Sequence, residues 1–380
     1  MLLAVLMYRQ ITEAGPSYQL TSGFGRYFAI VNKGGTPYRD FSVEYPPLAL
    51  GLFHLLGRAS FGAFVRQIIL VNIAAQALIA WLCFKGWGAR AGWSYLALSA
   101  PLMTIVYARY DLVGVAIAVA GAYLATRRVP AAAGLAWALA SFVKLWPVLL
   151  VPGLAARRHV RAFAVSVAAG LAGVAMWSAW GGTGALKQVV TYRDARGWEF
   201  ESVPGSVLRL LTRGPLRQES GAWRLGAPPA VFALLLGLAL VVAVAVIWWF
   251  VARHATTVGD GVAEVVVINV VLVTGTLLSP QFVVWILPWV AIAAAAGAVR
   301  IERWAAAVVG LTLLELTAFD VNDVGKVLTE IAVVARNIAL VGMLVVAVAE
   351  LRRTTRHTED PESPESWDPK VAVAADSGAV

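Results

Sequence analysis

The chain has 380 residues, of which 59% are hydrophobic and 14% are charged. Soluble domains carry about 25% charged residues, so this composition excludes an ordinary soluble globular protein and indicates a membrane protein. The formal net charge is +9, but the basic residues lie in short connections between apolar runs, where they set orientation and do not imply nucleic-acid binding. The single cysteine, Cys83, lies within an apolar run, which excludes a disulfide framework.

Apolar runs follow one another along the chain. The N-terminal MLLAVLMYRQ holds too few apolar residues to span a bilayer, so either a first helix is short and half-inserted or the recorded start is truncated. The fold class is therefore all-α and polytopic, with about 11–12 transmembrane or half-height helices. We expect helices at residues 63–84, 93–108, 110–126, 131–142, 144–156, 160–180, 229–252, 261–278, 282–299, 303–319 and 329–351.

Basic residues between these runs predict the orientation, because cytoplasmic connections carry an excess of Lys and Arg. All the basic groups can lie on the cytoplasmic side only if residues 131–156 enter and leave the membrane on that side, as two half-height helices with Lys144 near their turn. At 1.5 Å per residue, each half is about 18 Å long, too short to cross. The groups are Lys85/Arg90, Arg127/Arg128, Arg157/Arg158/Arg161, Arg253, Arg300/Arg303 and Arg352/Arg353/Arg356.

This topology makes residues 1–351 one integral-membrane domain with outer loops at about 9–62 and 181–228. The active side would be extracytoplasmic. The remainder, 352–380, contains HTEDPESPESWDPK and is predicted to be a disordered, acidic cytoplasmic tail.

Ionisable residues in or near hydrocarbon are costly and mark functional sites. Each also has a plainer interpretation: Arg109 and Asp111 as a mutually neutralised pair, Lys144 as a snorkelling side chain, and Asp40 and Glu44 as solvated loop charges. Their coincidence on the outer side favours a site. The polar groups are Arg39, Asp40 and Glu44 before Tyr45-Pro46-Pro47; Arg109 and Asp111; Lys144; Arg193, Asp194, Arg196, Glu199 and Glu201; and Ser279, Pro280 and Gln281.

Carboxylates beside Arg and Lys suit one kind of chemistry on a membrane surface. A carboxylate can deprotonate a hydroxyl as general base, and Arg and Lys can hold a phosphate. Together they fit attack by an acceptor hydroxyl on a sugar whose leaving group is a lipid phosphate. The half-height helices would leave a notch for the lipid chain.

The motifs PYRDFSVEYPP (37–47), ARYDL (108–112), KLWP (144–147), ESVPGS (201–206) and LLSPQFVVWILP (277–288) occur in this order. In order and spacing they resemble glycosyltransferase family 87, a polytopic family of the GT-C type that includes polyprenyl-phosphate-mannose-dependent mannosyltransferases. The Ala-, Arg-, Gly- and Trp-rich composition is similar to that of actinobacterial members. The resemblance implies a GT-C-like bundle and inverting transfer of a hexose, usually mannose, at the extracytoplasmic face of the plasma membrane.

On this resemblance, carboxylates would act on the acceptor, with Asp40 as general base and Glu44 and Asp111 as positioning or alternative bases. Arg109, Lys144 and Arg196 would bind the donor phosphate. The substrate pocket would comprise Arg39, Tyr45, Glu201, Ser202, Ser279 and Gln281. No cofactor or metal is indicated, and the expected partners are membrane lipid, a polyprenyl-phosphate sugar and a lipid or glycan acceptor, with no nucleic acid and no predicted oligomeric state.

One departure from the family pattern is informative. Many relatives carry an Asp 15–20 residues before the PYRDF-like motif, whereas this chain has Gln19, Leu20 and Thr21 there and no Asp before Asp40. Either Asp40 or Glu44 supplies the base, or the protein is an inactive scaffold of the cell envelope. A transporter or lipid flippase is the rival from another class, although it should spread polar residues through the membrane and show two related halves.

Overall fold

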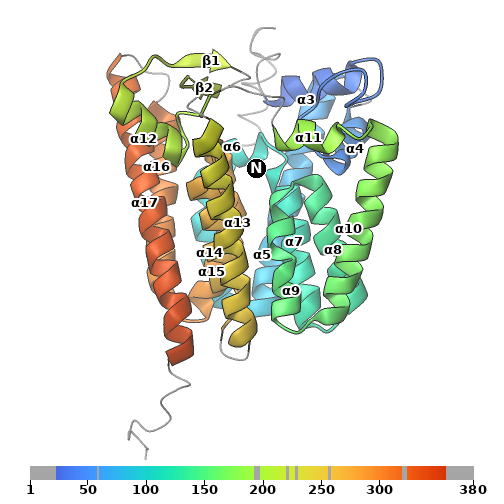
Figure 1. The fold of residues 1–380 in the computed structure, drawn as a ribbon, viewed down its shortest axis with the longest axis vertical. Helices are drawn as coiled ribbons and strands as arrows, with labels where there is room; N and C mark the ends of the chain where they lie inside the picture. Colours follow the sequence, from blue (N-terminus) through green and yellow to red (C-terminus); the bar gives the residue numbers. More distant parts are fainter. Residues whose placement is uncertain are drawn as a thin grey trace, which may run out of the picture.

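The computed structural model describes residues 23–57, 60–191, 197–219, 222–226, 230–255, 258–318 and 323–356. The described chain is a bundle of near-parallel helices with a layer of short helices and one small sheet across one end (Figure 1). We call this layer the outer end, and the opposite end of the bundle the basic end. An all-α polytopic membrane fold is thereby confirmed.

Among the residues that the structure describes, four segments are long and apolar enough to cross a membrane: Phe61–Tyr107, Val160–Gly181, Ala230–Arg253 and Val327–Arg353. The first comprises α5 (Phe61–Ser99), η1 (Ala100–Leu102) and α6 (Met103–Tyr107). The others lie in α10 (Val160–Gly181), α13 (Ala230–Arg253) and α17 (Asp323–Arg356). α10 and α13 expose most of their apolar side chains, which suits contact with lipid.

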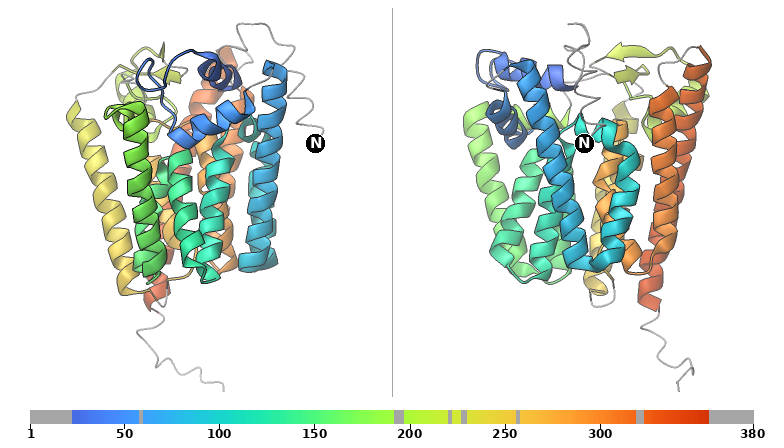
Figure 2. Two further views of the ribbon diagram at one scale, coloured as in Figure 1. Left: turned by 90° about the vertical axis from the view of Figure 1, so that its right-hand side faces the viewer. Right: turned by 180° about the vertical axis from the view of Figure 1, so that it is seen from behind.

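A reversal at Gly88 divides α5 into the two predicted helices. Gly88 has φ 89° and ψ 176°, a conformation that favours glycine. The two halves then run antiparallel, because Gln76 Nε2 donates to Ser99 Oγ at 3.1 Å and Asn72 Nδ2 donates to the Tyr107 carbonyl at 3.2 Å. Figure 2 shows the first half as the long helix at the edge of the bundle.

At three further positions the chain reverses direction next to a helix that is too short to span a membrane. α7 (Asp111–Thr126) follows α6 after three residues. α8 (Pro130–Val143) stops at Lys144, whose φ of −141° and ψ of 144° are extended, and the chain returns through η2 (Trp146–Leu150) and α9 (Pro152–Ala156). α14 (Val262–Thr274) likewise stops before η3 (Pro280–Trp285) and α15 (Leu287–Ala295). The 14-residue α8 is about 21 Å long, so the structure contains the half-height hairpin expected from residues 131–156.

Proline helps to fix where these short helices begin. Pro47, Pro130 and Pro152 each occupy a first helical turn, where the missing N–H has no intrahelical acceptor to lose. The central helices α14 and α15 are almost entirely buried, and α16 (Val299–Ala318) packs along α17. The core is therefore centred on α14 and α15, with one face of the long helix α5 buried against α15.

The basic connections meet at the end of the bundle opposite the small sheet (Figure 1). Arg157 donates to both carboxylate oxygens of Glu264 at 2.6 and 3.1 Å, and Arg90 pairs with Glu302. Arg127 Nη2 donates to the Lys85 carbonyl at 3.3 Å. These contacts join connections that are far apart in the sequence, as the common orientation requires.

The outer end is built from segments predicted as loops. Most of it is helical, because short amphipathic stretches cover the ends of the bundle. β1 pairs antiparallel with β2, with Arg217 opposite Arg224. The elements are α3 (Gly23–Asn32), α4 (Pro47–Leu56), α11 (Ala185–Val190), α12 (Val203–Thr212), β1 (Arg217–Glu219) and β2 (Ala222–Arg224).

Candidate functional site

A buried ion pair lies where the interrupted helices meet. Lys144 Nζ, at the tip of the α8 hairpin, is 3.0 Å from Asp111 Oδ1 at the start of α7. Trp285 Nε1, from η3, donates to the same oxygen at 2.8 Å. The Asp111 side chain is 1% exposed and that of Lys144 15%. Three chain reversals thus place one lysine and one carboxylate at a common point, with Lys144 still reachable.

Aromatic rings surround the Lys144 ammonium. Its Nζ lies 4.6 Å from the ring centroid of Tyr110, 5.1 Å from that of Phe282 and 5.5 Å from that of Trp285. Rings at these distances stabilise a cation electrostatically. Phe282 and Trp285 stack at 4.2 Å, so the ammonium faces a packed aromatic surface on this side.

Arg109 lies directly before the Asp111 helix. Asn72 Nδ2 donates to the Arg109 carbonyl at 2.5 Å and fixes this turn. The guanidinium packs over α3, where a Cβ added to Gly23 would come 1.6 Å from Arg109 Nη1. Arg109 Nε is buried and has no hydrogen-bond partner among the described residues. The donor set is therefore not fully used, which suits an anionic ligand.

The PYRDFSVEYPP motif forms a turn that leads into α4. Asp40 is exposed and its Oδ2 accepts from the Thr36 N–H at 2.5 Å. Arg39 is also exposed and donates to the Ala179 carbonyl at 2.6 Å. No contact joins Asp40 to the Lys144–Asp111 pair in the described part of the chain.

The second half of the motif turns inward. Glu44 is buried and its Oε1 lies 2.8 Å from Arg26 Nε of α3. The Tyr45 ring makes edge contacts with Tyr27 at 5.4 Å and Tyr110 at 5.7 Å. Tyr110 also faces Lys144, so Tyr45 is connected to the ion pair through one ring.

The ESVPGS segment and its preceding residues are anchored deep in the structure. Glu199 is 2% exposed; its Oε2 accepts from the Leu278 N–H at 2.8 Å and its Oε1 is 3.7 Å from Arg224 Nη2. The Ser202 hydroxyl caps α12 by accepting from the Gly205 N–H at 3.0 Å. The sequence indicated a role for Ser202 in a pocket, and the structure places its hydroxyl in this cap.

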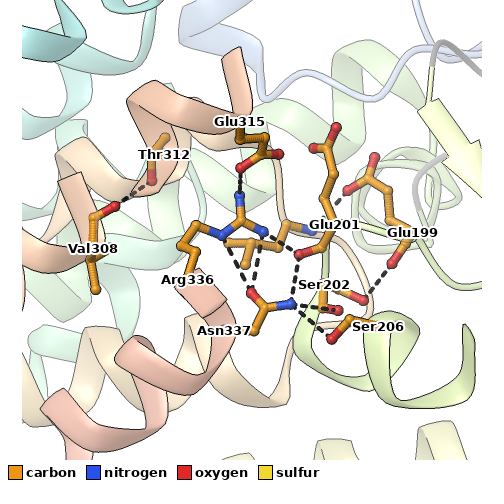
Figure 3. Close-up of polar contacts among 10 residues, drawn as sticks. Glu199, Glu201, Ser202, Ser206, Val308, Thr312, Glu315, Arg336 and Asn337 are labelled. Carbon is orange, nitrogen blue, oxygen red and sulfur yellow. Dashed lines mark hydrogen bonds and ion pairs between the residues drawn. The ribbon is translucent and has the colours of Figure 1, made fainter. Parts of the chain in front are cut away.

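Two helix residues that sequence reasoning missed hold this segment (Figure 3). Arg336 of α17 donates from Nη1 to Glu315 Oε2 of α16 at 2.5 Å and from Nη2 to the Glu201 carbonyl. Asn337 Nδ2 donates to the carbonyls of Glu201 and Ser202, both at 3.2 Å. Arg336 and Glu315 are isolated charges inside apolar runs, and this was the sequence signal that could have revealed the contact.

Other predicted residues lie apart from these contacts or outside the described residues. Ser279 and Gln281 flank the start of η3 and are partly exposed. Arg196, with Arg193 and Asp194, lies outside the described residues, as do Gln19, Leu20 and Thr21. The tail predicted at 352–380 starts too early, because α17 is helical to Arg356, and its remainder from residue 357 lies outside the described residues. The structure thus joins Lys144, Asp111 and Arg109 in one region but does not bring every candidate together.

An apolar groove runs beside the half-height helix α8. Its α8 wall ends at Phe142, two residues before Lys144, and its outer rim is formed by the residues that follow the PYRDFSVEYPP turn. The groove is lined by Pro47, Leu48, Leu135, Leu139, Phe142 and Met176, among others. The groove and the ion pair thus share helix α8, which ends at Val143.

These features define a polytopic helical membrane protein with a buried Lys–Asp pair enclosed by aromatic rings where the interrupted helices meet, and an apolar groove beside α8. A sequence model of glycosyltransferase family 87 matches residues 43–280. The match covers more than half of the chain, so the protein belongs to this family and is a membrane glycosyltransferase. It includes Glu44, Arg109, Asp111, Lys144 and Glu201. A search of curated proteins found no match.

Glu199 predicts a pH dependence of stability. Burial raises the pKa of its carboxyl from 4.5 to about 7, although Arg224 and the Leu278 N–H act in the opposite direction. Between these values the unfolded chain releases a proton that the folded protein retains, so this group's contribution to stability is present below pH 4.5 and is lost as pH rises to 7. We expect Glu199→Gln to reduce the slope of unfolding midpoint against pH in this window, measured by thermal unfolding in detergent. An unchanged slope would contradict the assignment of this pH dependence to Glu199.

Proposed function

We propose that the protein transfers a hexose, mannose in the first instance, from a polyprenyl phosphate to the hydroxyl of a lipid or glycan acceptor. Membership of glycosyltransferase family 87 supports transfer of a sugar. The observation that carries the lipid-phosphate donor is the partly reachable Lys144 beside Asp111, two residues after Phe142 of the apolar groove. A cation beside a lipid-sized groove suits a phosphate attached to a hydrocarbon chain.

The proposed location is the plasma membrane, with the outer end extracytoplasmic and the C-terminus cytoplasmic. The clustering of basic connections at the opposite end of the bundle supports this orientation, because Lys and Arg accumulate on cytoplasmic connections. A lipid-linked donor suits an outer site, because its head group is presented at the membrane surface.

In this mechanism the acceptor hydroxyl attacks the anomeric carbon and a carboxylate takes its proton. The bond between the anomeric carbon and the phosphate oxygen breaks, and the electron pair leaves with the polyprenyl phosphate. Lys144 and Arg109 would stabilise the developing charge on that phosphate. Asp111 would hold Lys144 in place. Attack opposite the leaving group inverts the anomeric configuration.

The test uses the purified full-length protein in nanodiscs with radiolabelled polyprenyl-phosphate mannose, glucose and arabinose and a membrane-lipid acceptor extract. We expect a labelled product with mannose and release of polyprenyl phosphate. In parallel proteoliposomes of the same protein, movement of the labelled donor from one leaflet to the other without a new glycosidic bond would support a flippase instead. Donor binding without turnover across the whole panel would indicate an inactive scaffold.

The groove predicts a dependence on lipid chain length. Leu139→Trp would fill part of the groove, so we expect KM for a long-chain donor to rise about tenfold, equivalent to about 1.4 kcal/mol, with little change for a short-chain analogue. The matched control is Leu171→Trp on α10, which is 68% exposed and does not line the groove. Equal effects of the two substitutions on KM would contradict this route for the chain.

A further inference from the structure

Glu201 differs from the other carboxylates of its region in having no partner for its side chain. Glu199 is bound by the Leu278 N–H and faces Arg224, and Glu315 is bound by Arg336. Within the described ranges, no hydrogen bond or ion pair reaches the Glu201 carboxylate, and the residue is partly exposed. In Figure 3 its side chain points away from Arg336 and Asn337. An unpaired carboxylate among paired ones has a free acceptor to offer a ligand.

The backbone carbonyl of Glu201 is fixed by hydrogen bonds from side chains of α17. Its carbonyl accepts from both Arg336 Nη2 and Asn337 Nδ2, and Asn337 also donates to Ser206 Oγ at 2.9 Å. Arg336 is itself fully buried and paired with Glu315. Two α17 side chains therefore fix the position from which the free carboxylate projects, as a preorganised catalytic group requires.

A hydrogen bond to the backbone connects the segment of Glu201 to the aromatic rings around Lys144. Glu199, two residues before Glu201, accepts from the Leu278 N–H at 2.8 Å, and Leu278 lies two residues before η3, whose Phe282 and Trp285 rings face the Lys144 ammonium. Burial, Glu315 and Glu199 raise the pKa of the Glu201 carboxyl well above the ordinary value, while Arg336 and Arg109 act in the opposite direction. A raised pKa makes a carboxylate a stronger proton acceptor at the pH where it is ionised.

We propose that Glu201 is the general base, with its carboxylate accepting the proton of the attacking hydroxyl. This assignment rests on the proposed transfer from a lipid phosphate. The acceptor O–H bond breaks and its proton passes to the Glu201 carboxylate. The acceptor oxygen forms the new bond to the anomeric carbon, and the phosphate leaves with the electron pair of the old bond. Asp40 is exposed and bonded to its own turn, which leaves it outside this step.

The test compares Glu201→Gln with the matched control Glu330→Gln in nanodisc-reconstituted full-length protein with the labelled mannose donor. Glu201→Gln keeps the shape and the clamped carbonyl, so we expect its unfolding midpoint and donor Kd to match the wild type while kcat falls at least 100-fold. Glu330 pairs with Arg209 and its side chain is 43% exposed, so Glu330→Gln should retain kcat within about threefold.

Two further measurements separate a base from a structural role. Glu201→Ala should lose activity and regain part of it with added formate, which supplies a small carboxylate in the vacated space. Glu201→Asp should retain partial activity with a displaced acidic limb of the pH–kcat profile; the charged groups that act electrostatically on this carboxylate are Glu199, Glu315, Arg109 and Arg336.

The outcomes distinguish this proposal from the proposed function. If the wild type transfers the sugar and Glu201→Gln does so at a similar rate, Glu201 is not the base although the function stands. A Glu201→Gln variant that loses donor binding in proportion to kcat, or a Glu330→Gln variant that loses as much kcat as Glu201→Gln, likewise overturns the base assignment. A wild type without turnover on any donor overturns the function and the base assignment with it.

Discussion

Replacing Lys144 with Met is expected to reduce kcat/KM by about 1,000-fold and to weaken binding of the polyprenyl-phosphate donor. Removal of one charge-stabilising donor from an enclosed site costs about 10²–10³-fold in rate, and Lys144 would also contribute to ground-state binding of the phosphate. Lys144→Arg should also lose activity, although it keeps the positive charge. The planar guanidinium does not fit the position of an ammonium enclosed by three rings. The measurements are steady-state kinetics and donor binding in nanodiscs.

A second effect of Lys144→Met must be separated from the first. Asp111 is 1% exposed and would keep only its contact with Trp285, and an unpaired buried charge costs about 3–5 kcal/mol. The double variant Asp111→Asn/Lys144→Met removes both charges, so its thermal stability should return towards the wild-type value. Its activity should remain absent. Recovery of activity together with stability would show that the pair is structural and that the phosphate binds elsewhere.

The sequence patterns predicted the long helices and the half-height hairpin well. The expected helix at residues 160–180 is α10 (Val160–Gly181), and the expected turn at Lys144 is where α8 ends. Both follow from local properties: apolar length in the first case, and the placement of basic connections at one end in the second. The outer layer was read as loops because α3 and α4 are only ten residues each and fall below the length of a membrane span.

The candidate site was predicted in part. Lys144 and Asp111 were identified because each is an ionisable residue in apolar surroundings, and the structure joins them directly. The contact between Arg336 and Glu201 connects residues 135 positions apart, and no local pattern encodes such a pairing. Glu201 was therefore predicted as a pocket residue. The hydrogen bonds from Arg336 and Asn337 to its carbonyl, which distinguish it from Glu199, could be found only in the folded chain.

Arg336→Met should be among the most destabilising single substitutions in the protein. Arg336 and Glu315 are 0% and 3% exposed at their side chains, so the substitution leaves a buried carboxylate without its cation, at a cost of about 3–5 kcal/mol in the free energy of unfolding. The matched control lies on the same helix. Arg353 and Glu350 pair at 3.5 Å with Arg353 56% exposed, so Arg353→Met should change stability by less than about 1 kcal/mol.

The double variant Arg336→Met/Glu315→Leu tests what the buried pair does beyond stability. Replacing both charges with apolar side chains removes the unpaired carboxylate, so the unfolding midpoint should recover most of the loss. The Glu201 carbonyl, however, would keep only the Asn337 donor at 3.2 Å, and its carboxylate would be held less firmly. We expect kcat to stay reduced about tenfold while donor Kd is unchanged. Full recovery of kcat with stability would show that the pair acts only on folding, because a clamp that positions the base must affect turnover when it is removed.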